Sequence, residues 1–387
     1  MSPVSAPRAT AHRRAPGRAL LVSSFVPPHR GGVEEFVASA RILLEERGWQ
    51  TRTLACRLPG LAAAADAVVS TRFVGPSSWP LPTGGWRTLW REVGAVDVVI
   101  ANGTSHLLPV LAVLAARARR RKAIFVLHGS GEYPGSRRIR FGRSLFERTL
   151  ARLALHLSHP ASVSRAGVVA ARKLYGVEAS YLPFPVRELP PVLDRPSLRP
   201  HGTMEITWVG RLFPEKDPVL AVEAVDVLRR EREVLLQVCG DGRLRPEVER
   251  LAMRRPWLIV HGTRSWGEVQ ALQGSAHVCL ATSVADNVQV AVLEALSRGI
   301  PTVSTRVGDA PEYYHRPSIR HLCVEPRNAE AVARALQDLA GSYDGYRQEF
   351  AANAAVLRAH HAKAGAALAG LAAAVIGGSV TPLASER

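Results

Sequence analysis

The sequence has little lysine, little cysteine, few aromatic residues and no long apolar run. Only 4 of its 50 basic residues are lysines, and 6% of its residues are aromatic. The four cysteines, at 56, 239, 279 and 323, have no paired spacing, which argues against a disulfide framework or a metal cluster and predicts reduced thiols in a cytosolic protein. No apolar run reaches the roughly 18 residues of a membrane-spanning helix; the Ala-rich stretch 364–377 is too short.

Positive charge is the strongest feature of the composition. The net charge is +17 and the pI is about 10.8, which predicts an anionic partner such as nucleic acid, an anionic bilayer or a phosphorylated substrate. Because no helix-turn-helix, zinc-finger or RNP-like pattern is present, we expect no nucleic-acid partner. The basic start is followed by a short apolar run that ends at Pro27-Pro28 without a small-residue cleavage site, which favours a first strand over a signal peptide.

Strand-like and helix-like segments alternate along most of the 387 residues, which is enough chain for two α/β domains with parallel sheets. We expect a disordered basic tail over 1–17 and a first domain over 18–185. A Pro-rich linker over 186–203 and a second domain over 204–359 follow. Residues 57–94 are poorly patterned, and we expect a packed loop there.

A strand–loop–helix unit at 278–301 carries two acids. Val278–Ala281 predicts a buried strand, and the helix that starts at Val290 ends at Gly299. Asp286 and Glu294 flank the helix start, where free N–H groups and the positive end of the helix dipole suit a phosphate. The two carboxylates can then bind the hydroxyls of a sugar and a ribose on either side of that phosphate.

A second unit at 206–219 carries two cations. The strand Ile206–Val209 leads into a turn with Arg211 and Lys216, followed by a helix from about Val219. Arg offers a planar fork for phosphate oxygens and Lys a mobile point charge. In a chain with so few lysines, Lys216 at this turn favours a phosphate site, although a solvated turn with incidental charges is the alternative.

These motifs resemble those of the retaining glycosyltransferases of family 4. The family turn V-G-R-x-x-x-x-K is matched by Val209-Gly210-Arg211 and Lys216, and the E-x7-E spacing by Asp286 and Glu294, with Asp in place of the first Glu. The stretch 239–242 resembles the V-G-D-G turn, and 307–312 resembles V-G-G-x-x-E. The resemblance implies the GT-B fold: two Rossmann-like, doubly wound parallel-sheet domains that face each other across a cleft, with a last helix, at about 360–378, that returns to the first domain.

The resemblance also implies roles for single residues. Arg211 and Lys216 would neutralise the leaving diphosphate, Glu294 would hold the ribose and Asp286 the sugar hydroxyls. His128 would contact the donor sugar. No residue stands out as a covalent nucleophile and no metal cluster is visible in the sequence, so no metal or cofactor is expected. The resemblance suggests that the leaving phosphate of the nucleotide-sugar donor itself accepts the acceptor's proton. The expected donor site comprises Gly31, Gly32, His128, Gly210, Arg211, Lys216, Asp241, Asp286, Asn287, Val290 and Glu294.

A segment at 136–157 combines arginines with an apolar stripe. Phe141, Leu145, Phe146, Thr149, Leu150 and Leu153 recur at helical spacing. Two interpretations stay open: an interfacial helix on an anionic membrane surface, or a helix packed on its sheet by this stripe. The first predicts a cytoplasmic protein that is peripheral on the inner face of the cell membrane, with a sugar or lipid-linked acceptor, as in cell-envelope polysaccharide synthesis.

Two other classes of function stay open. A nucleotide-sugar epimerase also uses two facing sheets, and it would release an altered free sugar without any acceptor. A degenerate, non-catalytic nucleotide-sugar-binding protein would account for Asp286 and for Phe184-Pro185-Val186 in place of the family's N-G-V-D turn. Product analysis distinguishes the epimerase, and nucleotide binding without turnover would indicate the binding protein.

Overall fold

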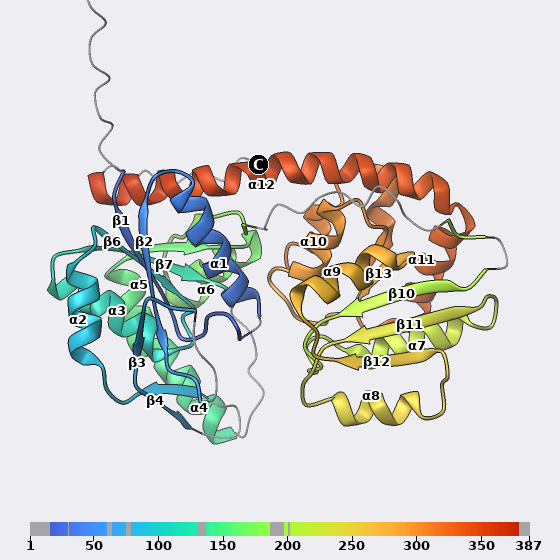
Figure 1. Ribbon diagram of the computed structural model, residues 1–387, viewed down its shortest axis with the longest axis horizontal. Helices are drawn as coiled ribbons and strands as arrows, with labels where there is room; N and C mark the ends of the chain where they lie inside the picture. Colours follow the sequence, from blue (N-terminus) through green and yellow to red (C-terminus); the bar gives the residue numbers. More distant parts are fainter. Residues whose placement is uncertain are drawn as a thin grey trace, which may run out of the picture.

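The computed structural model consists of two lobes bridged by one long helix (Figure 1). It describes residues 16–29, 31–59, 64–74, 79–129, 137–185, 197–199 and 202–378. Nearly all of the expected basic tail, 1–15, and most of the expected Pro-rich linker, 186–196 and 200–201, lie outside the described residues.

The first lobe is built on a parallel sheet with the strand order β3-β2-β1-β6-β7-β8-β9. Its central strands are buried, mostly apolar runs after the exposed first residues of β1 and β7, as expected for a sheet covered by helices on both faces. Its strands are β1 (Arg18–Ser23), β2 (Gln50–Cys56), β3 (Ala67–Val69), β6 (Val98–Asn102), β7 (Lys122–Leu127), β8 (His159–Ser162) and β9 (Ser180–Tyr181). Its helices are α1 (Gly32–Glu45), α2 (Trp86–Gly94), α3 (Leu107–Ala118), α4 (Arg137–Phe146), the π-helical turn η1 (Glu147–Ala151), α5 (Arg152–His156) and α6 (Arg165–Tyr175).

The expected packed loop at 57–94 is wrong for its described residues. They form strand β3, an antiparallel hairpin of β4 (Thr71–Val74) and β5 (Trp79–Pro82), and helix α2. The strands have only three or four residues, and two prolines lie in β5, so neither alternation nor length predicts them.

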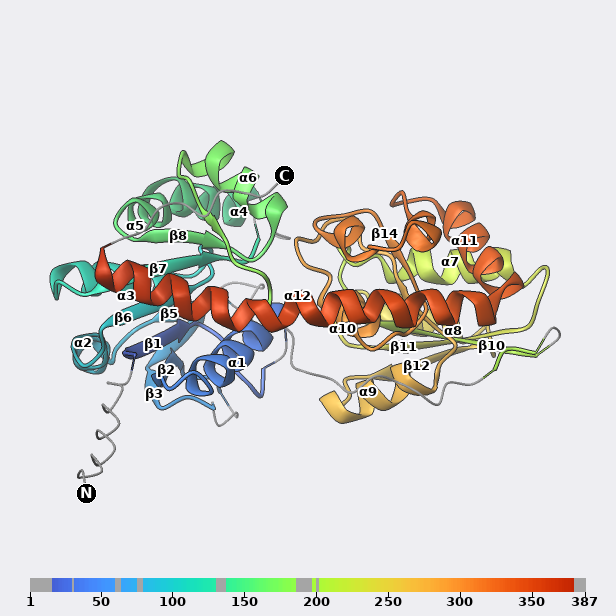
Figure 2. The same ribbon diagram turned by 90° about the horizontal axis from the view of Figure 1, so that it is seen from above.

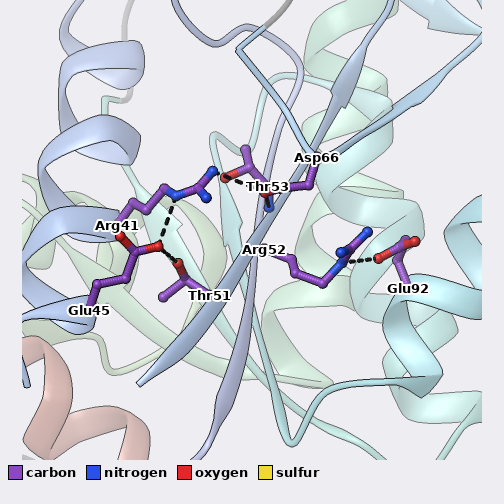
Figure 3. Close-up of polar contacts among 7 residues, drawn as sticks. All are labelled: Arg41, Glu45, Thr51, Arg52, Thr53, Asp66 and Glu92. Atoms are coloured by element: carbon purple, nitrogen blue, oxygen red, sulfur yellow. Dashed lines mark hydrogen bonds and ion pairs between the residues drawn. The ribbon is translucent and has the colours of Figure 1, made fainter. Parts of the chain in front are cut away.

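Polar side chains along β2 hold the neighbouring elements of this lobe in place (Figure 3). Arg41 of α1 pairs with Glu45 and with Asp66, both at 3.0 Å, and the Asp66 carboxylate accepts the backbone N–H of Thr53 at 2.7 Å. One residue earlier in the strand, Arg52 Nε donates to Glu92 of α2 at 2.6 Å. These contacts fix α1 and α2 relative to the edge of the sheet. The start of α1 carries Gly31 and Gly32, which define the Gly-Gly loop.

The second lobe is built on a parallel sheet with the order β12-β11-β10-β13-β14-β15. The two sheets confirm the predicted fold class of two doubly wound α/β domains. Its strands are β10 (Met204–Val209), β11 (Val234–Cys239), β12 (Leu258–Gly262), β13 (Val278–Ala281), β14 (Thr302–Thr305) and β15 (Cys323–Val324). Its helices are α7 (Pro218–Leu228), α8 (Arg245–Ala252), α9 (Trp266–Ser275), α10 (Val290–Ser297), α11 (Ala329–Gly341) and the 3-10 turns η2 (Ala310–Tyr313) and η3 (Pro317–Leu322).

Helix α12 (Tyr343–Gly377) runs along both lobes as one continuous helix (Figure 2). Its first half packs on α10 and η3 of the second lobe, and its second half on α1, β6 and β7 of the first. Phe350, Leu357, Leu368 and Ala372 are almost fully buried and recur at helical spacing, so one apolar face is continuous with the cores of both lobes. The helix therefore links the two lobes by packing on both of them.

The apolar stripe of the segment 136–157 is mostly exposed. Phe141 is 71% exposed, Leu145 53% and Leu153 48%, and Leu150 is also exposed. Phe146, Ala151, Ala154 and Leu155 are buried instead and pack with α3, β7 and α6 residues. The helix thus packs on its own lobe by a different face, and most of the stripe faces outward.

Candidate active site

The predicted site residues lie in loops at the carboxyl ends of strands, most of them at or next to the point where the strand order of a sheet reverses. In the first lobe the order reverses between β1 and β6, and in the second between β10 and β13. Ligands of doubly wound sheets bind outside the carboxyl ends of the strands at this point. The loops after β10 and β13 carry Lys216 and Asp286, and the loops after β1 and β7 carry the Gly-Gly pair and His128.

Lys216 is positioned by a tight turn between β10 and α7. Asp217 adopts a left-handed conformation and caps α7 by accepting the N–H of Leu220 at 3.2 Å. Thr282, in the loop after β13, donates its hydroxyl to the carbonyl of Asp217 at 2.6 Å. Two neighbouring loops are thereby joined, and the side chain of Lys216 forms an ion pair with Asp286. Both of these side chains are largely buried.

The Lys216–Asp286 pair lines a small recess at the start of α10. The recess opens to solvent, and its other lining residues include Trp208, Gln289 and Val290. Gln289 is the N-cap of α10, and its side chain makes no capping hydrogen bond. The first N–H groups of the helix therefore combine with a lysine in a way that suits an anionic group.

Arg211 lies at the rim and not in the recess. Its side chain is 57% exposed, donates to Glu215 at 3.3 Å and lies over the ring of Phe213. It is nevertheless close enough to the first lobe to help lower the pKa of Glu34. Asp241 is also exposed and pairs with Arg245 at 3.0 Å, while its backbone lies beside the turn, where its carbonyl accepts the N–H of Leu212.

Glu294 lies one turn farther along α10 and is nearly buried. Its carboxylate accepts the side-chain N–H of Gln270 of α9 at 3.3 Å. Arg298 in turn donates to the side-chain and backbone oxygens of Gln270 at 2.5 and 3.1 Å. This buried chain of contacts fixes the Glu294 carboxylate on the same helix whose start bounds the recess.

His128 follows β7 and is held by Asn102, a residue that was not among the predicted site residues. Its Nε2 lies 3.2 Å from Oδ1 of the fully buried Asn102. The amide nitrogen of Asn102 donates to the carbonyls of Val22 and Ile100, so Oδ1 is the atom that faces the imidazole. Nε2 is therefore the protonated nitrogen and Nδ1 the acceptor. A polar residue directly at the end of a buried strand is the signal that could have identified Asn102.

Burial determines the charge of His128. Desolvation lowers its pKa from 6.5 to about 3, and the nearby Glu34 carboxylate opposes this shift only in part. The ring also packs edge-on against Phe36, with a centroid distance of 4.7 Å. His128 is thus a neutral imidazole that accepts or donates hydrogen bonds without carrying charge.

The Gly-Gly loop rests on a buried carboxylate. Glu34 bonds to His29 Nδ1 at 2.6 Å; burial opposes its ionisation, but the contacts with His29 and Arg211 hold the net pKa below its usual value. A Cβ atom on Gly31 would lie 2.5 Å from Glu34 Oε2, so any larger residue there would displace the Glu34 carboxylate. A Cβ on Gly32 would touch Val290, which places this loop against the start of α10.

The two lobes are joined at a second point by Asp309. Its carboxylate accepts the backbone N–H groups of Arg165 and Ala166, the first residues of α6, at 2.9 and 3.2 Å. Arg165 also pairs with Glu312 at 3.2 Å. Burial raises the pKa of Asp309, and these two N–H groups lower it in part. Asp309 is the one position at which 307–312 departs from V-G-G-x-x-E.

The structure therefore brings together Lys216, Asp286, Val290 and Gly32 at the recess. It places Asn287 beside Gly129, the neighbour of His128, because a Cβ on that glycine would lie 3.6 Å from Asn287 Nδ2. Arg211 and Asp241 do not line the recess. Among the described residues, no group of three His, Cys, Asp or Glu side chains could hold a metal ion, and no helix is long and apolar enough to cross a membrane.

Several solved structures share this architecture. HepE of Anabaena in complex with UDP-glucose superposes with a TM-score of 0.65 at 14% identity, over 92% of this chain and 99% of that one. Sucrose-phosphate synthase of Thermosynechococcus elongatus gives 0.65 at 15% identity, over 88% and 94%. The lipopolysaccharide outer core galactosyltransferase WaaB gives 0.60 at 16% identity, over 90% and 98%. The fold is GT-B.

Two family models assign the chain more closely. Glycosyltransferase Family 4 matches residues 30–182, and Glycosyl transferases group 1 matches 203–342, so most of both lobes is covered. The chain belongs to glycosyltransferase family 4 and is a glycosyltransferase of the GT-B type. It is 24% identical over 321 residues to a component of the phosphatidylinositol N-acetylglucosaminyltransferase of Arabidopsis thaliana, over 76% of this chain and 68% of that protein. It is 31% identical to the sulfoquinovosyl transferase SQD2 of the same plant, over 28% of this chain and only 20% of that protein.

Proposed function

We propose that the protein moves a sugar from a nucleotide-diphosphate donor to an acceptor, with retention of configuration at the anomeric carbon. The observation that carries this proposal is the recess at the start of α10, where Lys216 and Asp286 meet free helix N–H groups beneath the Gly-Gly loop. Family neighbours whose structures contain UDP-glucose and UDP support a nucleotide-sugar donor.

Each group in the recess has a distinct task in this proposal. Lys216 and the N–H groups of α10 bind the diphosphate and stabilise its charge as it leaves, which is where electrostatic stabilisation contributes most. Arg211 at the rim adds charge when the donor is bound. Asp286 binds sugar hydroxyls and exchanges its contact with Lys216 for contacts with the donor. Glu294 binds the ribose.

The transfer itself takes place on one face of the sugar. The bond between the anomeric carbon and the leaving phosphate oxygen breaks, and the acceptor oxygen bonds to the same face of that carbon. The acceptor's proton passes to the leaving phosphate, so no metal or further cofactor enters the proposal. His128, neutral and oriented by Asn102, offers Nδ1 to a sugar hydroxyl.

The acceptor is lipid-linked or part of a cell-envelope polysaccharide in this proposal, and the protein docks peripherally on an anionic membrane from the cytoplasmic side. The exposed Phe141, Leu145 and Leu153 lie beside the exposed Arg148 and Arg152, which matches an interfacial helix. The net charge of +17 favours the same surface. The name of the Arabidopsis phosphatidylinositol N-acetylglucosaminyltransferase adds support for a lipid acceptor.

Two substitutions test the donor site. We expect Lys216→Ala to lower turnover of a nucleotide-sugar donor at least about 100-fold, the usual cost of one group that stabilises transition-state charge. We expect Glu294→Gln to lower kcat/KM about tenfold, because it removes a charged hydrogen-bond acceptor of the ribose. Donor hydrolysis and transfer would be measured across a panel of UDP- and GDP-sugars. Lys173→Ala and Glu223→Gln, at exposed positions of α6 and α7, are the matched controls. Unchanged rates in both site variants would overturn the proposal.

A further inference from the structure

Gln289 carries a buried polar atom that has no partner in the described part of the chain. The residue is 3% exposed. Its Nε2 donates to the carbonyl of Thr305, at the end of β14, at 2.8 Å. That contact fixes the direction of the amide, so the other terminal atom is the carbonyl oxygen Oε1, and this atom makes no hydrogen bond. An unsatisfied buried acceptor costs about 1–3 kcal/mol, so such an atom calls for a ligand.

The position of Gln289 points to where that ligand lies. The residue is the N-cap of α10 and lines the same recess as Lys216 and Asp286. Its side chain does not cap the helix, so it neither shields the helix N–H groups nor is held by them. A second unpartnered amide atom, Asn287 Nδ2, lies two residues earlier in the same loop. The loop therefore presents an acceptor and a donor around Asp286.

We propose that Gln289 determines donor specificity by accepting a hydrogen bond from a hydroxyl or amide N–H group of the donor's sugar. This inference rests on the proposed function. An amide oxygen accepts hydrogen bonds but does not donate them, so Oε1 repels a phosphate oxygen and selects an O–H or N–H group. The diphosphate is bound by Lys216 and the helix N–H groups, and Gln289 selects the sugar attached to it.

The test separates the sugar from the nucleotide. Wild-type protein is first titrated calorimetrically with UDP-glucose, UDP-galactose, UDP-N-acetylglucosamine and GDP-mannose to find its donor. The dissociation constants of that donor and of the matching free diphosphate, UDP or GDP, are then compared in wild type, Gln289→Leu and Gln289→Met. We expect both variants to bind the sugar nucleotide about tenfold more weakly than wild type does. The dissociation constant of the free diphosphate should change less than about twofold. Gln337→Leu, on the exposed side of α11, is the control.

Monodeoxy analogues of the donor sugar identify the group that is bound. In wild type, one analogue should lose about tenfold in affinity, and Gln289→Leu should bind that analogue and the parent donor equally, as a double-mutant cycle requires. If the Gln289 variants lose as much affinity for the free diphosphate as for the sugar nucleotide, this inference is overturned. Unchanged binding in both variants would also overturn it. A wild-type protein that binds no member of the panel would overturn the proposed function and the inference with it. Gln289→Met, which keeps the length of the side chain, serves where the leucine variant fails to fold.

Discussion

The charge of single residues in this site is determined by burial, and His128 shows the effect most clearly. Its pKa is lowered from 6.5 to about 3, because desolvation disfavours the imidazolium. Between these two values the unfolded chain binds a proton that the folded protein does not. Acid therefore favours the unfolded state, and the stability contributed by neutral His128 is lost progressively as pH falls from about 6.5 towards 3.

We expect His128→Gln to remove this component of the acid sensitivity. The free energy of unfolding, measured with urea at pH 7.5 and 5, should fall by about 2 kcal/mol more in wild type than in the variant. His156→Gln, at an exposed position of α5, controls for the loss of a histidine. Equal pH dependence in wild type and His128→Gln would show that the imidazole is not desolvated as the structure indicates.

Residues of the site were predictable from sequence only where a motif carries them. Lys216, Asp286 and Glu294 follow from their spacing around two strand–helix units; Lys216 and Asp286 line the recess, and Glu294 lies one turn farther along α10, where it contacts Gln270. Asn102, Gln289 and Asp309 act through contacts with residues 16 to 144 positions away, and no local pattern encodes such contacts. Arg211 has the right spacing, but the nearby Glu215 holds its side chain at the rim.

At the level of elements, those with strong hydrophobic periodicity could be predicted from the sequence, and the short strands could not. The buried apolar strands and the alternation of strand and helix over 204–340 correspond closely to β10 to α11. The hairpin β4–β5 was missed because its strands are short and two of its four residue pairs involve proline. The stripe on α4 and α5 was visible in the sequence, but only the packing of Phe146 and Leu155 shows which side of the helix faces the core.

The exposed stripe leads to a prediction about membranes. We expect wild-type protein to co-sediment with vesicles of phosphatidylcholine mixed with phosphatidylglycerol much more than with phosphatidylcholine alone, because apolar burial and attraction to anionic lipid both contribute. The double variant Phe141→Glu/Leu153→Glu should weaken this binding at least about tenfold. Met253→Glu, at an 82% exposed position of the second lobe, is the matched control.

Two experimental outcomes would contradict the membrane prediction. Equal sedimentation of wild type with neutral and anionic vesicles would show that the positive charge serves another partner. Equal loss of binding in Met253→Glu would show that any added negative charge weakens attachment, so that the face formed by α4 and α5 has no special role.

At the scale of the whole molecule, the lobes are joined by helix α12 and by the carboxylate of Asp309. Helix α12 packs on both cores and fixes the lobes at one side. On the site side, Asp309 binds the first two N–H groups of α6, and Ser164 caps the third at 2.9 Å. A helix cap supplied by the other lobe contributes stability only while the lobes are together, so Asp309 favours the closed arrangement.

Removing the Asp309 carboxylate should allow the two lobes to move apart. We expect Asp309→Ala to increase the radius of gyration measured by small-angle X-ray scattering without ligand, and to lower stability by about 1 kcal/mol, the usual cost of losing a helix cap. Asp309→Asn should stay closed, because asparagine caps helices as well as aspartate does. Glu223→Ala, which removes an exposed charge from α7, is the control for altered net charge. If Asp309→Ala keeps the dimensions of wild type, the other contacts between the lobes hold them together and the carboxylate serves only α6.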